Sequence, residues 1–212
     1  MSQLAFSLLG LPRLERDGQP VHIDRRRSVA VAIYLALSGR AVSREALAAF
    51  FWPEHDERSA RTDLRRTLHG LNRALGAEWF LADEEKVAFR QHNTLWIDVI
   101  EFRRLLAACD EHGHHADDVC PRCLPLLQQA VALYNDDFLD GFSLSDSPAF
   151  DDWQFFEGEQ LRDELAAALD RLAYGYSVQG AYAQATAAAR RRLALDPLYE
   201  PAHRQLMHLY AW

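Results

Sequence analysis

Lysine, cysteine and long apolar runs are all scarce in this chain of 212 residues. Lys86 is the single lysine among 23 basic residues, so arginine carries nearly all the positive charge. Arginine is the better side chain for bidentate contacts to phosphate and guanine. No run of about eighteen apolar residues occurs, which argues against a membrane-spanning helix. The opening MSQLAFSLLGLPRLERDG lacks the basic start and apolar stretch of a signal peptide, so we expect a cytoplasmic protein.

Motifs of common enzymes are also missing. The chain contains no G-x-S-x-G element, no G-x-x-x-x-G-K-[ST] phosphate loop, and no Ser, His and Asp in an order that a fold would bring together. Paired acids such as Asp136-Asp137 and Asp151-Asp152 are more typical of helix caps than of catalytic dyads. We therefore expect that the protein is not an enzyme.

The charge is distributed unevenly along the chain. Residues 1–96 carry fourteen Lys and Arg against twelve Asp and Glu, a net of +2. Residues 97–212 carry nine against nineteen, a net of −10. A near-neutral half joined to an acidic half is a common layout for a nucleic-acid reader with a regulatory module.

The start of the chain predicts a pair of strands. Apolar residues alternate at Leu4, Phe6 and Leu8, and again over residues 21–23. The dipeptide Asp17-Gly18 lies between these segments and is typical of a tight hairpin turn.

Three helical patterns follow the strand pair, and a second set of extended pieces follows the helices. The helices are expected to begin near Ser28, Ser43 and Ser59, with Gly76 after the last turn of the third. Between residues 79 and 97 the pieces WFLA, KVAF and LWI predict a β-hairpin and one more strand. This order predicts an α+β winged helix-turn-helix domain with an extra N-terminal sheet.

The third helix, residues 59–75, has the features of a recognition helix. Leucines at 64, 68, 71 and 75 form an apolar seam. A helical projection places a polar set opposite or beside that seam: Thr62, Arg65, Arg66, His69, Asn72 and Arg73. These residue types bind base edges and phosphates in a major groove. An ordinary solvated face is the alternative, but the preceding helix and the following hairpin, with Lys86, Arg90 and His92, favour DNA.

Several consecutive segments resemble a known family of regulators. LLGLPRLERDGQPVHI, RRRSVAVAIYLALSGRAVSREALAAFFWP and SARTDLRRTLHGLNRALG are similar to the N-terminal half of the Streptomyces antibiotic regulatory protein (SARP) family. DVIEFRRLL, AVALYNDDFLDGF and FDDWQ are similar to the bacterial transcriptional activator domain that accompanies it. The resemblance implies an OmpR-like winged helix over residues 1–97 and an all-α, tetratricopeptide-like activator domain over residues 98–212.

The resemblance also implies a sequence-specific transcription activator. Such proteins bind direct repeats in double-stranded promoter DNA, where a homodimer can assemble, and engage RNA polymerase. Carried onto this sequence, the helix 59–75 and a wing at 83–94 place these residues near DNA: Arg61, Thr62, Arg65, Arg66, His69, Arg73, Lys86 and Arg90. The acidic PEHDERSA before the helix departs from the pattern and Asp63 would face away from phosphate, so the sequence preference does not transfer. The alternative is a protein-interaction module whose winged helix docks to protein.

One stretch of the second half matches a tetratricopeptide repeat. The matching positions are Ala173, Tyr176, Gly180, Tyr182, Ala185, Ala189 and Pro197. Arg192 departs from the pattern because a small residue is usual there. A further helix is expected from Pro201, and the sequence stops before its partner helix. We therefore expect a truncated domain that continues into further C-terminal domains, or helices that pair with another chain.

All three cysteines lie within fifteen residues, in a segment rich in histidine. Two pairs with metal-ligand spacing can present a tetrahedral set to a structural zinc ion: Cys109, His112, Cys120 and Cys123. His114 or His115 could replace His112. The alternatives are three reduced thiols beside a His-rich loop, or a Cys120–Cys123 disulfide that responds to redox state.

Overall fold

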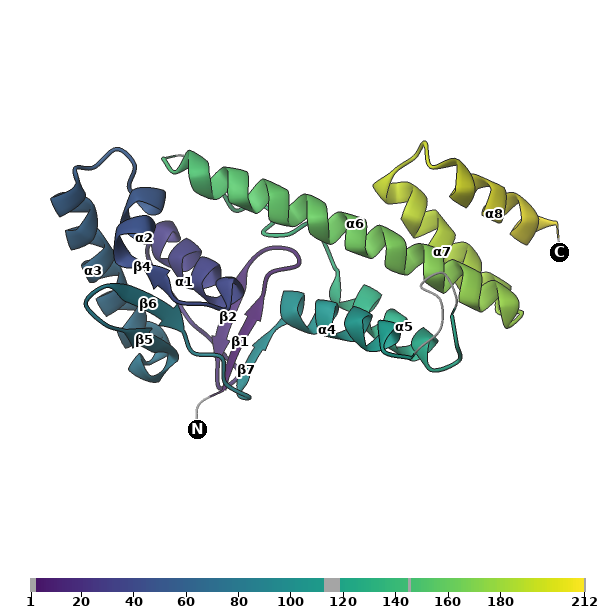
Figure 1. Ribbon diagram of the computed structural model, residues 1–212. Coiled ribbons are helices and arrows are strands. Elements are labelled where there is room, and N and C mark those ends of the chain that lie inside the picture. The colour runs from purple at the N-terminus through teal and green to yellow at the C-terminus, as the bar shows by residue number, and fades with distance from the viewer. Residues whose placement is uncertain (1–2, 113–118, 145, 212) are drawn as a thin grey trace. The chain divides into compact units, whose positions relative to one another are not determined.

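The computed structural model describes residues 3–112, 119–144 and 146–211 (Figure 1). The chain forms two compact units. The first contains Met1–Ile97 together with Phe138–Phe156, and the second contains Asp98–Asp137 together with Glu157–Trp212. The domain boundary expected after residue 97 thus coincides with one of the points where the chain passes from one unit to the other. The segment Phe138–Phe156, which the sequence placed in the C-terminal domain, belongs to the first unit.

A four-stranded sheet opens the first unit, in the order β3-β2-β1-β7. Its strands are β1 (Leu4–Ser7), β2 (Arg13–Arg16), β3 (Gln19–Pro20) and β7 (Leu95–Ile97). β1 runs parallel to β7, and the other pairs are antiparallel. The extra N-terminal sheet is therefore present, and a parallel strand from the end of the winged-helix segment completes it.

The predicted strand pairing within this sheet was wrong in part. Asp17 and Gly18 do form a tight turn, with φ angles of 51° and 74°, but the turn joins β2 to β3. The partner of β1 is β2, and residues 21–23 lie outside any strand. β2 escaped detection because Leu14 is the one buried residue in Arg13–Arg16, so no apolar alternation marks it.

The other elements of the first unit before β7 form a winged helix-turn-helix, which confirms the predicted fold class. They are α1 (Arg26–Ser38), β4 (Val42–Ser43), α2 (Arg44–Phe51), α3 (Glu57–Leu75), η1 (Ala77–Trp79), β5 (Phe80–Ala82) and β6 (Lys86–Phe89). The strands form an antiparallel sheet in the order β4-β6-β5. The β5–β6 hairpin lies beside α3 in Figure 1 and is the wing.

Local capping explains where the two helices of the helix-turn-helix begin. The Ser43 hydroxyl accepts a hydrogen bond from the Ala46 N–H at 3.0 Å, which confirms Ser43 as the cap of α2. α3 begins two residues before the predicted start because Asp56, not Ser59, is its cap. The Asp56 carboxylate accepts from both the hydroxyl (2.7 Å) and the N–H (3.0 Å) of Ser59.

The segment Phe138–Phe156 completes the core of the first unit. Leu139 N–H donates to the carbonyl of Leu8 at 2.9 Å, and the Ser147 hydroxyl donates to the carbonyl of Phe50 at 2.9 Å. Phe150 is fully buried, and its ring lies 5.8 Å from that of Phe51 in α2. A stretch distant in sequence therefore covers the aromatic side of the helix-turn-helix.

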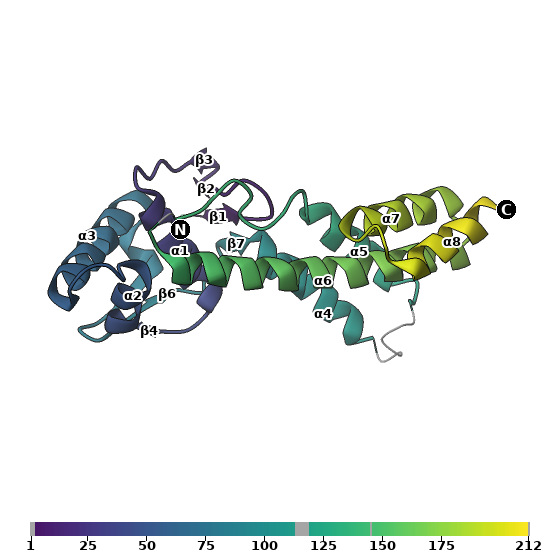
Figure 2. The same ribbon diagram turned by 90° about the horizontal axis from the view of Figure 1, so that it is seen from above.

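The second unit is helical. Its elements are α4 (Asp98–Asp110), α5 (Cys123–Leu133), the later part of α6 (Pro148–Val178), α7 (Tyr182–Leu195) and α8 (Glu200–Tyr210). α7 and α8 run side by side (Figure 2). Gly180 has a φ of 72° and so permits the turn from α6 into α7. Within 3–112, 119–144 and 146–211, every helix falls short of the length and apolarity that crossing a membrane demands.

Candidate nucleic-acid interface and metal site

α3 presents one buried face and one exposed face. The predicted leucine seam is buried, together with two smaller neighbours: Ala60, Leu64, Thr67, Leu68, Leu71 and Leu75. Arg65, Arg66, His69 and Arg73 are exposed, and Thr62 is half-buried. The helical period therefore predicted correctly which side chains point away from the core.

Two of the arginines on α3 already have acidic neighbours. Arg61 lies 2.8 Å from Glu57 and 3.9 Å from Glu45 of α2. Arg66 lies 3.4 Å from Asp63. Both arginines are more than half exposed, so each pair contributes little to stability and can open when a stronger anion binds.

The other cations of α3 are differently placed. Among the residues that the structure describes, Arg65, His69 and Arg73 make no ion pair closer than 4.0 Å. The Thr62 hydroxyl donates to the carbonyl of Arg58 at 2.9 Å, within its own helix. Among the predicted cations of α3, Arg65, His69 and Arg73 can therefore meet an external partner without first losing an ion pair to a described residue.

The wing has an acidic tip, and two basic residues follow it along β6. Asp83, Glu84 and Glu85 form the exposed turn, while Lys86 and Arg90 stand at the two ends of β6. The Asp83 carboxylate accepts from the N–H groups of Lys86 (2.6 Å) and Glu85 (2.8 Å), and these bonds hold its pKa below the usual value. The carboxylate of Asp83 is thus used within the turn.

A groove runs between the wing tip and the two helices of the helix-turn-helix. Its lining combines cations and acids: Ser43, Arg44, Glu45, Arg61, Leu64, Arg65, Ala82, Asp83, Glu84, Glu85 and Lys86. Arg44 Nε donates to the carbonyl of Asp83 at 2.7 Å and so ties the start of α2 to the wing. The wing is thus tied to α2, and Arg65 of α3 lines the same groove as Lys86.

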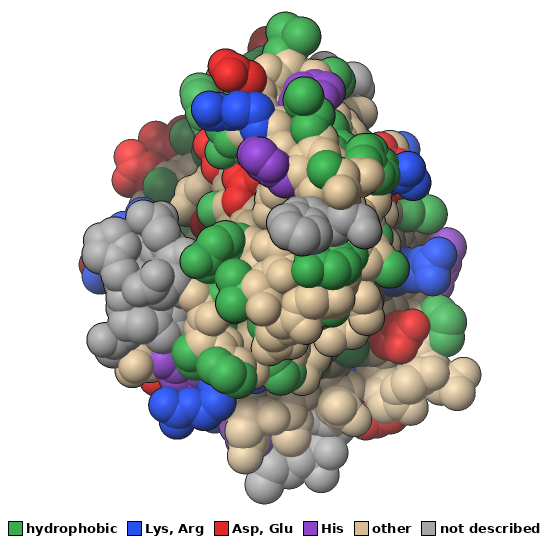
Figure 3. All heavy atoms as spheres, turned by 90° about the vertical axis from the view of Figure 1, so that its right-hand side faces the viewer, with side chains coloured by type: hydrophobic (Ala, Val, Ile, Leu, Met, Phe, Trp, Pro, Cys, Tyr) green, Lys and Arg blue, Asp and Glu red, His purple; other side chains and the backbone are tan. Residues whose placement is uncertain are grey.

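The part of the second unit that carries α7 and α8 offers a different surface. Figure 3 views the end that carries α7 and α8, where basic side chains lie apart from one another among acidic and hydrophobic ones. Leu198, Met207 and Tyr210 are large apolar residues exposed there, at 90%, 72% and 59%. This surface does not resemble the basic face of α3.

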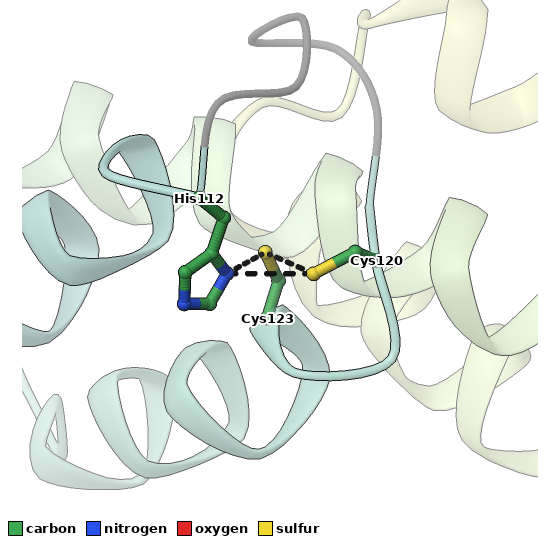
Figure 4. Close-up of side chains that lie close together, drawn as sticks. All are labelled: His112, Cys120 and Cys123. Atoms are coloured by element: carbon green, nitrogen blue, oxygen red, sulfur yellow. Dashed lines mark hydrogen bonds between the residues drawn. The ribbon is translucent and has the colours of Figure 1, made fainter.

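Three of the four predicted metal ligands meet at the junction of α4 and α5 (Figure 4). His112 Nδ1 lies 3.1 Å from Cys123 Sγ and 3.4 Å from Cys120 Sγ, and the two sulfur atoms are 3.4 Å apart. Donors around a tetrahedral zinc ion, at ordinary Zn–S and Zn–N lengths, are about 3.5 to 3.8 Å apart. Shifts of a few tenths of an ångström would therefore accommodate the ion.

The fourth predicted ligand, Cys109, lies outside this cluster. Its thiol is fully buried and contacts the carbonyls of Leu105 at 3.5 Å and Cys123 at 3.8 Å. Burial, with the neighbouring Cys123, raises the pKa of Cys109 to about 11. Cys109 is not among the three donors that lie within 4.8 Å of one another, so it does not belong to the candidate ligand set. His114 and His115 lie outside the described residues.

The pKa of Cys120 is shifted in the opposite direction, below the usual value. Burial alone would raise its pKa, but hydrogen bonds from the side chain and backbone of Cys123 and from the backbone of Arg122 outweigh that effect and lower it to about 6. Burial and the adjacent Cys120 raise the pKa of Cys123. The pair thus loses one proton readily and retains the other, and a bound cation would favour release of both.

A winged helix-turn-helix joined to a helical unit is an architecture of transcription regulators. Residues 97–211 match the family model described as the bacterial transcriptional activator domain. The chain therefore belongs to this family of transcriptional regulators, which confirms the predicted membership.

A solved structure shares the fold of the whole chain. It is described as Mycobacterium tuberculosis EmbR in complex with low affinity phosphopeptide, and it superposes with a TM-score of 0.74 at 21% sequence identity. The match covers 99% of this chain and 55% of that one, so this chain spans about half the length of that protein. No curated protein sequence matches the chain.

Proposed function

We propose that this protein is a sequence-specific DNA-binding transcription activator whose helix α3 enters the major groove. The observation that carries the proposal is the exposed face of α3, where Arg65, His69 and Arg73 stand free of ion pairs among the described residues. An α-helix fits the major groove, and arginine there reads guanine. The buried leucine seam fixes the helix to its domain, so these side chains are presented from a rigid element.

The contacts divide into two kinds. Arg65, His69 and Arg73 are assigned to base edges, because they are exposed on the helix that enters the groove and carry no ion pair there. The phosphate contacts, which position the protein on the duplex, are assigned to Thr62, Arg61, Arg66, Lys86 and Arg90. For Arg61 and Arg66, a phosphate takes the place of the carboxylate that each now contacts.

The rest of the proposal concerns the setting of this DNA contact. The protein acts in the cytoplasm as a regulator and not as an enzyme. Its acidic C-terminal half engages RNA polymerase or further domains of a longer chain, and two protomers assemble on direct repeats. These partners are supported by family membership and by the net charge of −10 over residues 97–212, which disfavours extended DNA contact there.

Selection of duplexes from a random pool tests the proposal. We expect the wild-type protein to enrich one sequence family. Arg65→Ala and Arg73→Ala should each weaken binding to the enriched duplex by about 5- to 150-fold, because each removes a base contact of about 1–3 kcal/mol. Arg204→Ala, an exposed arginine of α8, serves as the matched control and should bind as the wild type does.

Two results would contradict this assignment. If both α3 variants bind the enriched duplex as tightly as the wild type, α3 is not the recognition helix. If no duplex is enriched at all, the winged helix docks to protein instead.

We also propose that His112, Cys120 and Cys123 bind a structural zinc ion. The proposal is supported by the three donor atoms, which lie within 4.8 Å of one another at the ends of two helices. Two thiolates and an imidazole are donors that zinc prefers. The ion would join the last turn of α4 to the first turn of α5.

Metal analysis of the purified protein tests this site. We expect about one zinc per chain, retained in Cys109→Ala and lost in Cys120→Ser, because Cys109 is not among the clustered donors. Plasma emission spectroscopy provides the measurement. If zinc-loaded wild-type protein contains no zinc after dialysis, the cysteines are ordinary reduced thiols or a redox pair.

A further inference from the structure

The thiol–imidazole cluster lies where two helices of the second unit meet a third. His112 follows the end of α4, and Cys123 begins α5. The segment Val119–Leu124, which carries both clustered thiols, and the end of α4 each contact α6. The cluster is therefore placed to influence how the α4–α5 pair packs on α6.

Gly175 is the first contact between α6 and the thiol segment. A Cβ atom at this position would lie 2.7 Å from Leu124 Cδ2 and 2.9 Å from Val119 Cγ1. Real Cβ atoms do not approach other atoms so closely, so the segment rests directly on the backbone of α6. Cys120 and Cys123 lie between these two contacting residues in sequence. Any displacement of the cysteines would therefore move the contact with Gly175.

Arg171 makes the second contact, one turn earlier on α6. Its guanidinium lies 3.2 Å from Asp110, the last residue of α4. The Arg171 side chain is 16% exposed, but Asp110 is 65% exposed. The ion pair alone therefore contributes little to the stability of this contact. Two further nitrogens of Arg171, Nε and one terminal nitrogen, are buried without a hydrogen-bond partner among the residues that the structure describes. The contact between the end of α4 and α6 is thus weak, although the Arg171 side chain that makes it is mostly buried.

We infer that binding of a zinc-class cation and packing of the α4–α5 pair on α6 are coupled, with the cation as an effector of the second unit. The inference rests on the proposed zinc site and adds its regulatory role. An ion shared by His112, Cys120 and Cys123 fixes both sides of the junction at once. Without the ion, Val119–Leu124 separates from Gly175 and the α6 backbone there opens to solvent.

Reciprocity supplies the sharpest test. If zinc favours the packed arrangement, a change that disfavours packing must weaken zinc binding by the same free energy. Gly175→Ala inserts a Cβ into the contact, and we expect zinc affinity to fall by about tenfold or more, as for an overpacked interior. Gly70→Ala is the matched control, because its Cβ meets nothing within 4 Å in α3, and it should bind zinc as the wild type does.

Amide hydrogen exchange on the wild-type chain provides a second readout that needs no variant. Removal of zinc by a chelator should speed exchange around residues 171–178 of α6 and in α5, and leave α3 unchanged. This comparison decides the question if Gly175→Ala does not fold. A wild-type chain that binds no zinc would overturn the proposed site itself. Zinc binding of equal affinity in Gly175→Ala, with unchanged exchange in α6, would overturn the coupling and leave the site standing.

Discussion

Arg192 shows how a residue that breaks a sequence pattern can be accounted for by its surroundings. It occupies a repeat position where a small residue is usual, yet its side chain is buried. Its Nε lies 3.3 Å from Asp170, and its guanidinium stacks on the ring of Tyr199 at 3.7 Å. The arginine thus joins α7 to α6 and to the turn before α8. Burial raises the pKa of Asp170, while the charge of Arg192 opposes that rise.

Arg192→Ala should destabilise the protein by about 1–3 kcal/mol, because the half-buried Asp170 carboxylate loses its cation. The difference in unfolding free energy between the variant and the wild type should become smaller as the pH falls. The pKa of Asp170 is higher in the folded state than in the unfolded chain, so protonation favours folding, and it removes the charge that the variant leaves unpaired. Urea unfolding of variant and wild type in neutral and acidic buffer measures both effects.

Arg204→Ala is the control for this prediction. Arg204 lies 3.7 Å from Glu200 on the exposed side of α8, and its loss should cost less than about 1 kcal/mol. A deficit for Arg192→Ala that stays constant or grows in acid would contradict the role assigned to Asp170.

The segment Phe138–Phe156 is the feature of most consequence at the scale of elements. It places Phe150 and Trp153 against Tyr34 and Phe51 of the helix-turn-helix, with ring centroids between 5.2 and 5.8 Å apart. Arg26 of α1 lies over the ring of Phe142 at 4.9 Å and donates to the carbonyl of Gly141 at 3.1 Å. The winged helix therefore depends on residues that follow it by more than forty positions.

Phe150→Ala should destabilise the first unit by about 3–5 kcal/mol, the usual cost of removing a fully buried phenylalanine. Phe155→Ala is the matched control on the same helix. Its side chain is 62% exposed, so the change in unfolding free energy should stay within about 0.5 kcal/mol. Equal effects of the two substitutions in urea unfolding would show that the segment does not contribute to the core of the first unit.

The sequence predicted elements well where local pattern determines them. The leucine seam of α3, the Ser43 cap of α2 and the wing hairpin all follow from short-range periodicity or capping chemistry. β2 was missed, and the packing of Phe138–Phe156 on the helix-turn-helix was not predicted, because both depend on partners far along the chain.

The same distinction applies to the candidate sites. The outward side chains of α3 follow from a period of 3.6, but the approach of Glu45 to Arg61 joins two helices and leaves no local signal. Cysteine spacing indicated a metal site, whereas the position of the Cys109 thiol outside the cluster depends on the packing of α4 against α5.

At the scale of the whole molecule, an acidic protein is proposed to bind a polyanion. The net charge is −8, so long-range attraction to DNA is weak and binding must depend on local cations. Those cations lie on α3 and at the two ends of β6, and the acidic wing tip of residues 83–85 directly precedes Lys86. Affinity for DNA should therefore be strongly sensitive to salt while remaining modest for random sequence.

The dependence of duplex affinity on salt tests the DNA-binding account most directly. The logarithm of the association constant should fall linearly with the logarithm of salt concentration, with a slope of about −0.9 for each phosphate contacted. Removal of Lys86 or Arg90 should reduce the slope by about one contact each. A duplex affinity that is absent, or that does not change with salt, would contradict DNA binding by this domain and favour docking of the winged helix to protein.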